Sequence, residues 1–137
     1  MPSANLDLAR SIFDAWERGD FSSAEWADHE IEFVHADGPS PGCWSGLAGM
    51  AEATRMWIGA WDEFSVEAED YRELDDERVL VLTRYGGRGK RSGLDVENMR
   101  AMGASVVHLR EGQVTRFVQY WVRDRALADL GITPKME

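Results

Sequence analysis

Residues 31–46, IEFVHADGPSPGCWSG, join an alternating apolar segment to a proline-rich turn and the start of a helix. The alternation places Ile31, Phe33 and Asp37 on one face of a strand. The first two are apolar and should face the core, so the same parity directs the Asp37 carboxylate inward. That carboxylate is a candidate acid or base. The competing interpretation is a turn residue, because Asp-Gly-Pro is ordinary turn chemistry.

Length and charge limit the classes of protein to consider. The chain has 137 residues, of which 44% are hydrophobic, and this predicts one domain over residues 1–137 with a single core. The formal net charge of −10 argues against a nucleic-acid partner, since phosphate binding needs a basic face. No apolar stretch reaches the roughly 18 residues of a membrane span, and the N-terminal segment lacks a signal-peptide pattern. We therefore expect a cytoplasmic protein without a membrane partner.

Cysteine and histidine usage gives no metal-site pattern. The chain has one cysteine, Cys43, and three histidines without the spacing of metal ligands. We interpret Cys43 as a small apolar side chain in a loop, His29 as solvated, and His108 as a structural or interface residue on the strand face opposite Ser105. No metal site is expected.

Helical spacing of apolar residues appears first near the N-terminus. It predicts a helix that ends at Gly19. Asp20 is a candidate cap for a short second helix that ends in ADHE, residues 27–30. Ser45 is a candidate cap for a third helix, whose apolar stripe continues to Trp61.

A period of two replaces the helical spacing in the second half of the chain, which predicts strands. Four segments with this pattern are expected to form an antiparallel meander: residues 64–74, 78–85, 94–110 and 114–122.

The connections of this meander also carry signals. Residues 86–93 are a glycine-rich connector, Gly103 suggests a bulge or bend, and residues 110–113, REGQ, form a tight hairpin. Asp124 is expected to cap a closing helix that ends at Gly131.

Helices gathered early and strands gathered late indicate an α+β fold. In such a fold the N-terminal helices pack on a strongly bent antiparallel sheet. A bent sheet closed by helices forms a cone, and the mouth of the cone is the natural place for a pocket.

Two segments in this order of elements resemble a known superfamily: WADHEIEFVHADGPSPGCWSGLAGM (residues 26–50) and GASVVHLREGQVTRFVQYWVRDRALADLGI (residues 103–132). They are similar to the nuclear transport factor 2-like superfamily, most closely its SnoaL-like polyketide-cyclase branch. The resemblance implies a cystatin-like cone. The superfamily includes cyclases, isomerases, dehydratases, epoxide hydrolases and proteins without catalysis, so its fold alone does not choose among them.

A weaker resemblance to ketosteroid isomerase implies roles for individual residues. The isomerase's general-base aspartate lies nine residues before the glycine of an SG pair, and here that position is Asp37, before Gly46. The positions of its two oxyanion-hole donors fall on Ile12 and Ser105, so both familiar donors are replaced. The Ser105 hydroxyl is a weaker donor. The closing QYW also looks like the isomerase's last strand, in which the tryptophan, here Trp121, lines the pocket.

Asp37 and His35 are the candidate catalytic residues. An apolar cavity disfavours the charged carboxylate and raises its pKa toward the range useful for proton transfer. His35 lies on the same strand face and either assists Asp37 or is a hydrogen-bonded core residue. The residues expected to contact substrate are Phe13, Trp16, Phe33, Trp44, Trp57, Arg84, Met99, Ser105, Val107, Phe117 and Trp121.

The sequence leaves the place of Arg84 open. It either pairs with Glu97 across the ladder or binds an anionic group of a ligand. The sequence does not fix whether Arg84 or its neighbour Tyr85 faces inward.

The leading functional hypothesis is a pocket protein that binds a small hydrophobic carbonyl or polycyclic compound and catalyses isomerisation, cyclisation or elimination without a cofactor. The alternative is a non-catalytic ligand-binding or dimerisation module. A third reading, epoxide hydrolysis, needs an Asp-Arg-Asp set, of which Asp37 and Arg84 supply two members. The resemblance also implies a homodimer, with Val106, Val118 and Val122 as apolar residues on its outer sheet face.

Overall fold

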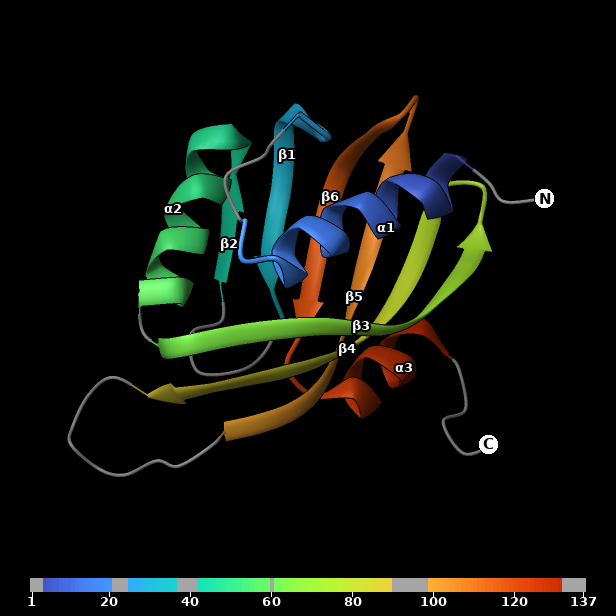
Figure 1. Cartoon of the computed structure of the whole chain (residues 1–137). Helices are drawn as coiled ribbons and strands as arrows, with labels where there is room; N and C mark the ends of the chain where they lie inside the picture. Colours follow the sequence, from blue (N-terminus) through green and yellow to red (C-terminus); the bar gives the residue numbers. More distant parts are fainter. Residues whose placement is uncertain (1–3, 21–24, 37–41, 60, 90–98, 132–137) are drawn as a thin grey trace.

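The computed structural model describes residues 4–20, 25–36, 42–59, 61–89 and 99–131. Within these residues, the helices and strands form one sheet with helices on both of its faces (Figure 1). In chain order the elements are α1 (Ala4–Glu17), β1 (Ala27–His35), β2 (Gly42–Ser45), α2 (Gly46–Gly59), β3 (Trp61–Asp75), β4 (Arg78–Gly89), β5 (Met99–Arg110), β6 (Gln113–Tyr120) and α3 (Arg123–Leu130).

The sheet has the strand order β2-β1-β6-β5-β4-β3. The pair β1 and β6 is parallel and every other neighbouring pair is antiparallel. The predicted four-stranded meander, which corresponds to β3 through β6, is therefore confirmed. Figure 1 shows that β3 and β4 sweep across the direction of β1 and β6, so the sheet is strongly bent.

The inner face of the sheet, defined as the face that carries Phe33 and Phe117, is covered by α1. The helix buries Ala9, Ile12 and Phe13 against it, in one cluster with both phenylalanines. The Phe13 ring centroid lies 6.1 Å from that of Phe117. Helix α2 closes the side of the same layer next to β1 and β2 (Figure 1). The cone expected from the order of elements is thus present, with an aromatic core.

The outer face is covered by α3. Ala126 and Leu127 of this helix pack in a second cluster with Val106 and Val118 of the sheet. Both valines were expected on an exposed surface for a second copy of the chain. That expectation is wrong, because α3 of the same chain buries them. Val122 is 49% exposed, and the homodimer stays a prediction.

The structure corrects the predicted second helix. Residues 27–30 open strand β1, where Ala27 is paired with Val114 and is buried. The backbone N–H of Val114 also donates to the carbonyl of Trp26 at 2.8 Å. Tertiary pairing with β6 therefore overrides the local capping signal. The remaining part of that prediction, residues 21–24, lies outside the described residues.

Three smaller differences concern the ends of strands and helices. Residues 42–45 form β2, because they pair antiparallel with β1, whereas the sequence suggested only a rigid turn. Residues 86–89 extend β4 instead of opening a glycine-rich connector. Helix α3 follows Val122, which makes no side-chain capping bond, so Asp124 is not the cap. Gly131 ends the helix in the left-handed region, as predicted.

Gly103 is a point of close approach. The β4–β5 register runs through it without a shift, so of the predicted bulge or bend the bulge is absent from this pairing. A Cβ at this position would overlap the carbonyl oxygen of Tyr120 and lie 2.6 Å from Cε2 of Tyr85. The missing side chain is therefore what lets the Tyr85 ring lie over the sheet.

We expect Gly103→Ala to lower the free energy of unfolding by about 3 kcal/mol, because the added methyl group must push a strand or the Tyr85 ring aside. Urea unfolding measures the loss. Gly19→Ala is the control, since its Cβ meets nothing within 4 Å and only the positive φ of 86° costs about 1 kcal/mol. Equal losses in the two variants would contradict the proposed clash.

Arg123 ties α3 to three strands. Its Nε donates to the carbonyl of Gly103 at 3.1 Å, and one terminal nitrogen donates to the carbonyl of Thr83 at 2.8 Å and to Glu69 Oε1 at 2.6 Å. The other Glu69 oxygen pairs with Arg84 at 2.7 Å. Strands β3, β4 and β5 are thereby joined on the outer face.

The hydrogen bond from Arg123, more than the nearby arginine charges, holds the pKa of Glu69 below its usual value, against a smaller opposing effect of burial. A carboxyl group whose pKa is lower in the folded protein stabilises the fold at pH values above its unfolded-state pKa. This stabilisation is lost as the pH falls through the folded-state pKa. We expect the stability advantage of wild type over Glu69→Gln to be largest near pH ~7 and to vanish toward pH ~3. Urea unfolding across this pH range measures it.

Glu30→Gln is the charge-matched control for this series. Glu30 is an exposed carboxylate on β1 that makes no ion pair with the other described residues. A Glu69→Gln difference that does not change with pH, or that Glu30→Gln reproduces, would show that the contact with Arg123 is not its source.

Candidate functional site

A row of aligned residues crosses the inner face of the sheet. The register pairs His35 of β1 with Gln119 of β6, Gln119 with Ser105 of β5, Ser105 with Val81 of β4, and Val81 with Tyr71 of β3. Because aligned residues of neighbouring strands project to the same side, these five side chains share the inner face. The row brings together polar groups from strands that are far apart in the sequence.

Burial confirms the side on which this row lies. Phe117 belongs to the inner cluster, and Val118 and Tyr120 belong to the outer cluster, so the intervening Gln119 faces inward. In the same way, Ser105 lies between Ala104 and Val106, which both belong to the outer cluster, so Ser105 faces inward. His35 is 7% exposed and Ser105 is fully buried, whereas Gln119 is half-buried. We call His35, Gln119 and Ser105 the polar row, and Gln119 is the most accessible of these three.

His35 is held between aromatic rings. Its ring centroid lies 5.5 Å from Phe33 and 5.0 Å from Trp44, in edge-on contacts at 62°. Trp44 is on β2, directly opposite Phe33. The short strand that the sequence did not predict therefore fixes one wall around the histidine. Asp37, two residues further on, lies outside the described residues.

Tyr85 and Trp121 form a stacked pair next to this row. Their ring centroids are 5.1 Å apart and the planes differ by 8°. Tyr85 is 4% exposed and belongs to the inner cluster, which decides the question that the sequence left open. Tyr85, and not Arg84, faces inward.

Arg84 lies on the outer face, where it pairs with Glu69 and is half exposed. It was expected to contact substrate, to pair with Glu97 or to complete an Asp-Arg-Asp set. Arg84 therefore does not lie on the inner face, and its prediction as a substrate-contacting residue is corrected. The physical reason is strand alternation, because buried Tyr85 takes the inward direction. Glu97 lies outside the described residues.

The remaining residues that the sequence placed in the pocket divide into two groups. Phe13, Phe117 and Val107 are fully buried in the inner cluster, and Trp16 packs against it at 5.0 Å from Phe13. They form core behind the polar row. Two further predicted residues belong to described elements but have side chains outside the described part of the structure: Trp57 and Met99.

Tyr71 closes the far end of the row. Burial, and then the nearby carboxylates of Asp14 and Glu17, raise its pKa to about 12. The Arg10 guanidinium lies 4.8 Å from the ring centroid and opposes this shift. The phenol therefore stays protonated at neutral pH, and Tyr71 is not a base.

His108 lies on the outer face, opposite Ser105 as the sequence predicted, between Arg78 and Arg116 of the neighbouring strands. Burial lowers its pKa, and the two arginines lower it further. The imidazole is therefore mainly neutral at neutral pH. This histidine belongs to the surface of the sheet away from the polar row.

Two hydroxyl groups of the inner face are buried without a hydrogen-bond partner among the described residues: Thr83 Oγ1 and Ser105 Oγ. Both side chains are fully buried. A buried polar group without a partner typically costs about 1–3 kcal/mol, so such groups stand out in a well-packed core. They lie on the neighbouring strands β4 and β5. Thr83 is paired with Gly103, which is two residues before Ser105.

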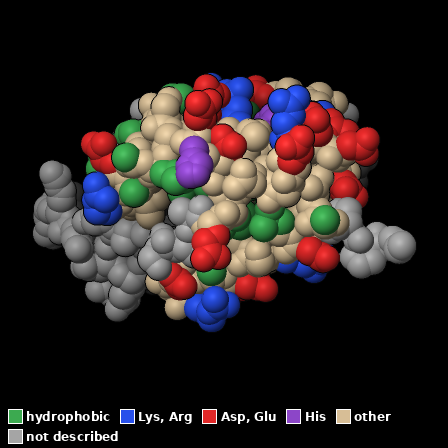
Figure 2. Space-filling model, turned by 90° about the horizontal axis from the view of Figure 1, so that it is seen from above, with side chains coloured by type: hydrophobic (Ala, Val, Ile, Leu, Met, Phe, Trp, Pro, Cys, Tyr) green, Lys and Arg blue, Asp and Glu red, His purple; other side chains and the backbone are tan. Residues whose placement is uncertain are grey.

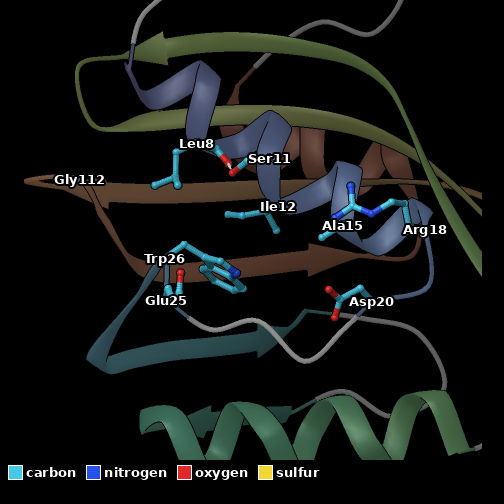
Figure 3. Close-up of a pocket in the computed structure, with 9 residues that line it drawn as sticks. All are labelled: Leu8, Ser11, Ile12, Ala15, Arg18, Asp20, Glu25, Trp26 and Gly112. Carbon is cyan, nitrogen blue, oxygen red and sulfur yellow. Dashed lines mark hydrogen bonds between the residues drawn. The ribbon is translucent and has the colours of Figure 1, made fainter.

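A separate hollow lies beside α1 (Figure 3). Its volume is about 370 Å³, and it runs between α1, the residues that precede β1, and the hairpin at Gly112. Leu8, Ile12 and Trp26 form its apolar middle, and Arg18 and Asp20 lie together at one end. None of the predicted site residues whose side chains the structure describes lines it. Acidic and basic side chains interleave on the coloured part of the face seen in Figure 2.

Sequence reasoning missed two inward residues, Gln119 and Thr83, and left the direction of Tyr85 open. Strand alternation could have identified Gln119 as inward, because it lies two residues after Phe117 and two before Trp121. Thr83 is the only polar residue between Arg78 and Arg84 in an otherwise apolar segment, and this pattern could have drawn attention to it. The stacking of Tyr85 needs Gly103 on the next strand, and no local pattern reveals this.

Among the described residues, no group of histidine, cysteine or carboxylate side chains is arranged to hold a metal ion. No helix in the described part of the chain is long and apolar enough to cross a membrane.

Solved structures share this architecture. A nuclear transport factor 2-like protein of unknown function from Burkholderia pseudomallei is 17% identical, with a TM-score of 0.75 over 92% of this chain and 96% of the other. TerC, co-crystallised with polyporic acid, is 18% identical, with a TM-score of 0.71 over 93% and 98%. A protein of unknown function with a cystatin-like fold from Xanthomonas campestris is 14% identical, with a TM-score of 0.71 over 86% and 98%. At these identities the likeness shows the fold alone.

The bent sheet, its helical layer and these likenesses define the α+β fold of the nuclear transport factor 2-like superfamily, as predicted. The sequence model of the SnoaL-like domain matches residues 9–117, and the chain belongs to that family. No curated protein matches the sequence.

We expect Thr83→Val to raise the free energy of unfolding by about 1 kcal/mol, because the substitution keeps the shape and removes a buried unpartnered hydroxyl. Urea unfolding measures the change. Thr54→Val is the matched control: the Thr54 hydroxyl donates to the Met50 carbonyl at 3.0 Å, so its loss should cost about 1 kcal/mol. A similar cost in both variants would mean that the Thr83 hydroxyl has a partner.

Proposed function

We propose that this SnoaL-like domain binds a small, largely apolar carbonyl or polycyclic compound at the inner face of the sheet and moves a proton on it. The observation that carries the proposal is the polar row of His35, Gln119 and Ser105, set in a face that is mainly aromatic and aliphatic. Burial of a polar group in such surroundings costs free energy. A few polar groups that converge within apolar walls are typical of small-molecule sites.

In this proposal Asp37 is the general base and His35 assists it. The carboxylate takes a proton from the carbon next to the ligand's carbonyl, the C–H bond breaks, and its electron pair moves onto the carbonyl oxygen as an enolate. Return of the proton at another carbon gives isomerisation. Loss of a leaving group, which takes up the proton held by Asp37, gives elimination. Attack of the enolate carbon on a second carbonyl gives cyclisation, and the new alkoxide takes up that proton. Each outcome balances with no cofactor.

The geometry supports His35 as the assisting group. Its edge contacts with Phe33 and Trp44 restrict the orientation of the imidazole ring at the end of β1, two residues before Asp37. The structure of TerC with polyporic acid adds that a protein of this fold accommodates a small organic molecule. We take the same class of ligand as the working hypothesis for this chain.

Non-catalytic binding at the same face is the second candidate. The observation that favours it is Ile12, which is 1% exposed in the inner cluster at the position where the isomerase resemblance places a donor tyrosine. A binding protein needs the apolar walls and does not need the enolate stabilised. Epoxide opening is not proposed, because Arg84 faces away from the inner face.

We expect Asp37→Asn to slow exchange of the α-protons of 2-tetralone for deuterium by about a hundredfold or more, because the amide does not accept the proton. Proton NMR in D₂O follows the exchange. Asp76→Asn, at an exposed position in the turn between β3 and β4, is the control and should keep the wild-type rate.

Unchanged exchange in Asp37→Asn would remove this residue from the mechanism. Binding of 2-tetralone without accelerated exchange by the wild type would favour the non-catalytic candidate. A titration of Asp37 by NMR adds an independent measurement, since a base in an apolar site should have a pKa above the usual aspartate range.

A further inference from the structure

We propose that the hollow beside α1 is a second binding site, and that it takes a small organic ammonium ion with an apolar body, of the arylalkylamine class. In this proposal Glu25 pairs with the ammonium group, and the apolar middle of the hollow holds the body of the ligand (Figure 3). The proposal goes beyond the proposed function, because it concerns another place in the fold and another class of ligand.

The hollow lies at the opposite end of β1 from the proposed catalytic residues. Trp26 directly precedes β1 and lines the hollow, whereas His35 ends the strand. At about 3.3 Å per residue, these two residues are on the order of 25 Å apart along the strand. No side chain of the polar row lines the hollow. A ligand held there leaves the inner face free.

The size and the apolar lining of the hollow suit a small molecule. Its volume of about 370 Å³ is within the range of roughly 300–1,000 Å³ that is usual for such sites. Leu8, Ile12 and Ala15 line it from α1, and Trp26 lies across from them (Figure 3). An aromatic or aliphatic group that enters between these side chains removes apolar surface from water, which favours binding.

Trp26 is held in place before any ligand binds. Its ring centroid lies 6.4 Å from that of Trp16 and 6.0 Å from that of Phe117. Its backbone carbonyl accepts the N–H of Val114 at 2.8 Å. This wall of the hollow is therefore preorganised, and a ligand loses little affinity to the ordering of the side chain.

The charges that line the hollow favour a cation. Arg18 and Asp20 lie together at one end and offset each other, while Glu25 lies at the other end beside Trp26 (Figure 3). Glu25 makes no ion pair or side-chain hydrogen bond with another described residue. The lining thus has two acidic side chains and one basic side chain. The net charge of −10 on the chain adds a potential that attracts cations.

The other two charge classes of ligand fit less well. An anion has only Arg18 to bind, beside the carboxylate of Asp20 and against the negative charge of the whole chain. A neutral molecule can occupy the apolar middle, but it gains no ion pair with Glu25. An ammonium group joined to an apolar ring uses both features of the hollow.

The experiment compares three probes with the same ring and similar size: 2-phenylethylammonium, 2-phenylethanol and phenylacetate. Their polar ends are positive, neutral and negative. NMR titration of the isotope-labelled full chain at low ionic strength gives the dissociation constants and the amides that shift. We expect the ammonium probe to bind about fivefold more tightly than the alcohol, the upper effect of one exposed ion pair. Phenylacetate should bind most weakly, and the shifts should centre on Ser11, Ala15 and Trp26.

Three variants locate the site. Glu25→Gln should reduce the preference for the ammonium probe over the alcohol to about one, without changing the affinity for the alcohol. Glu30→Gln is the matched control, because it removes the same charge from an exposed position on β1 outside the hollow. It should keep the fivefold preference. Ala15→Leu fills the hollow from α1 and should weaken the binding of both probes, while urea unfolding checks that the fold is kept.

Several results would overturn the proposal. Equal affinity of wild type for the ammonium probe and the alcohol, or no binding of either, would do so. An equal loss of preference in Glu25→Gln and Glu30→Gln would trace the effect to net charge alone. Unchanged binding in Ala15→Leu, or shifts centred on His35 and Gln119, would place the ligand elsewhere. Wild-type deuterium exchange of 2-tetralone in Glu25→Gln would support a site separate from the inner face, and slowed exchange would contradict it.

Discussion

The alternation of side chains along strands with two covered faces is the constraint on which this structure depends. In β5 and β6, α1 packs over one face and α3 over the other, so the direction of each buried residue is fixed. A shift of one residue in register would exchange the two faces. The same constraint that assigns Val106 and Val118 to the core under α3 assigns Ser105 and Gln119 to the inner face.

The inner face therefore combines two properties that usually conflict. Its aromatic and aliphatic walls stabilise the cone by burying apolar area, and they also raise the cost of any polar group among them. Ser105 and Thr83 carry that cost without partners among the described residues. Residues kept at a cost to stability are candidates for function, and this links the packing of the sheet to the proposed chemistry at His35 and Asp37.

A network of charged contacts on the opposite face has a structural role. Arg123 donates to carbonyls of two strands and to Glu69, and Glu69 also binds Arg84. These contacts hold α3 where the sheet bends. Gly103 belongs to the same place, because its carbonyl accepts from Arg123 while its missing side chain makes room for Tyr85. The shape of the inner face is thus partly maintained from the outside.

The sequence by itself determined the fold class, the meander of four strands and the inward parity of Phe33 and His35, because period and turn chemistry are local properties. Resemblance also indicated the SnoaL-like family. Only the tertiary structure decided that residues 27–30 are a strand, that Arg84 faces outward and that His35, Gln119 and Ser105 meet in one row. Those outcomes depend on pairing between segments distant in the chain, and register across strands is set by the packing of the whole sheet.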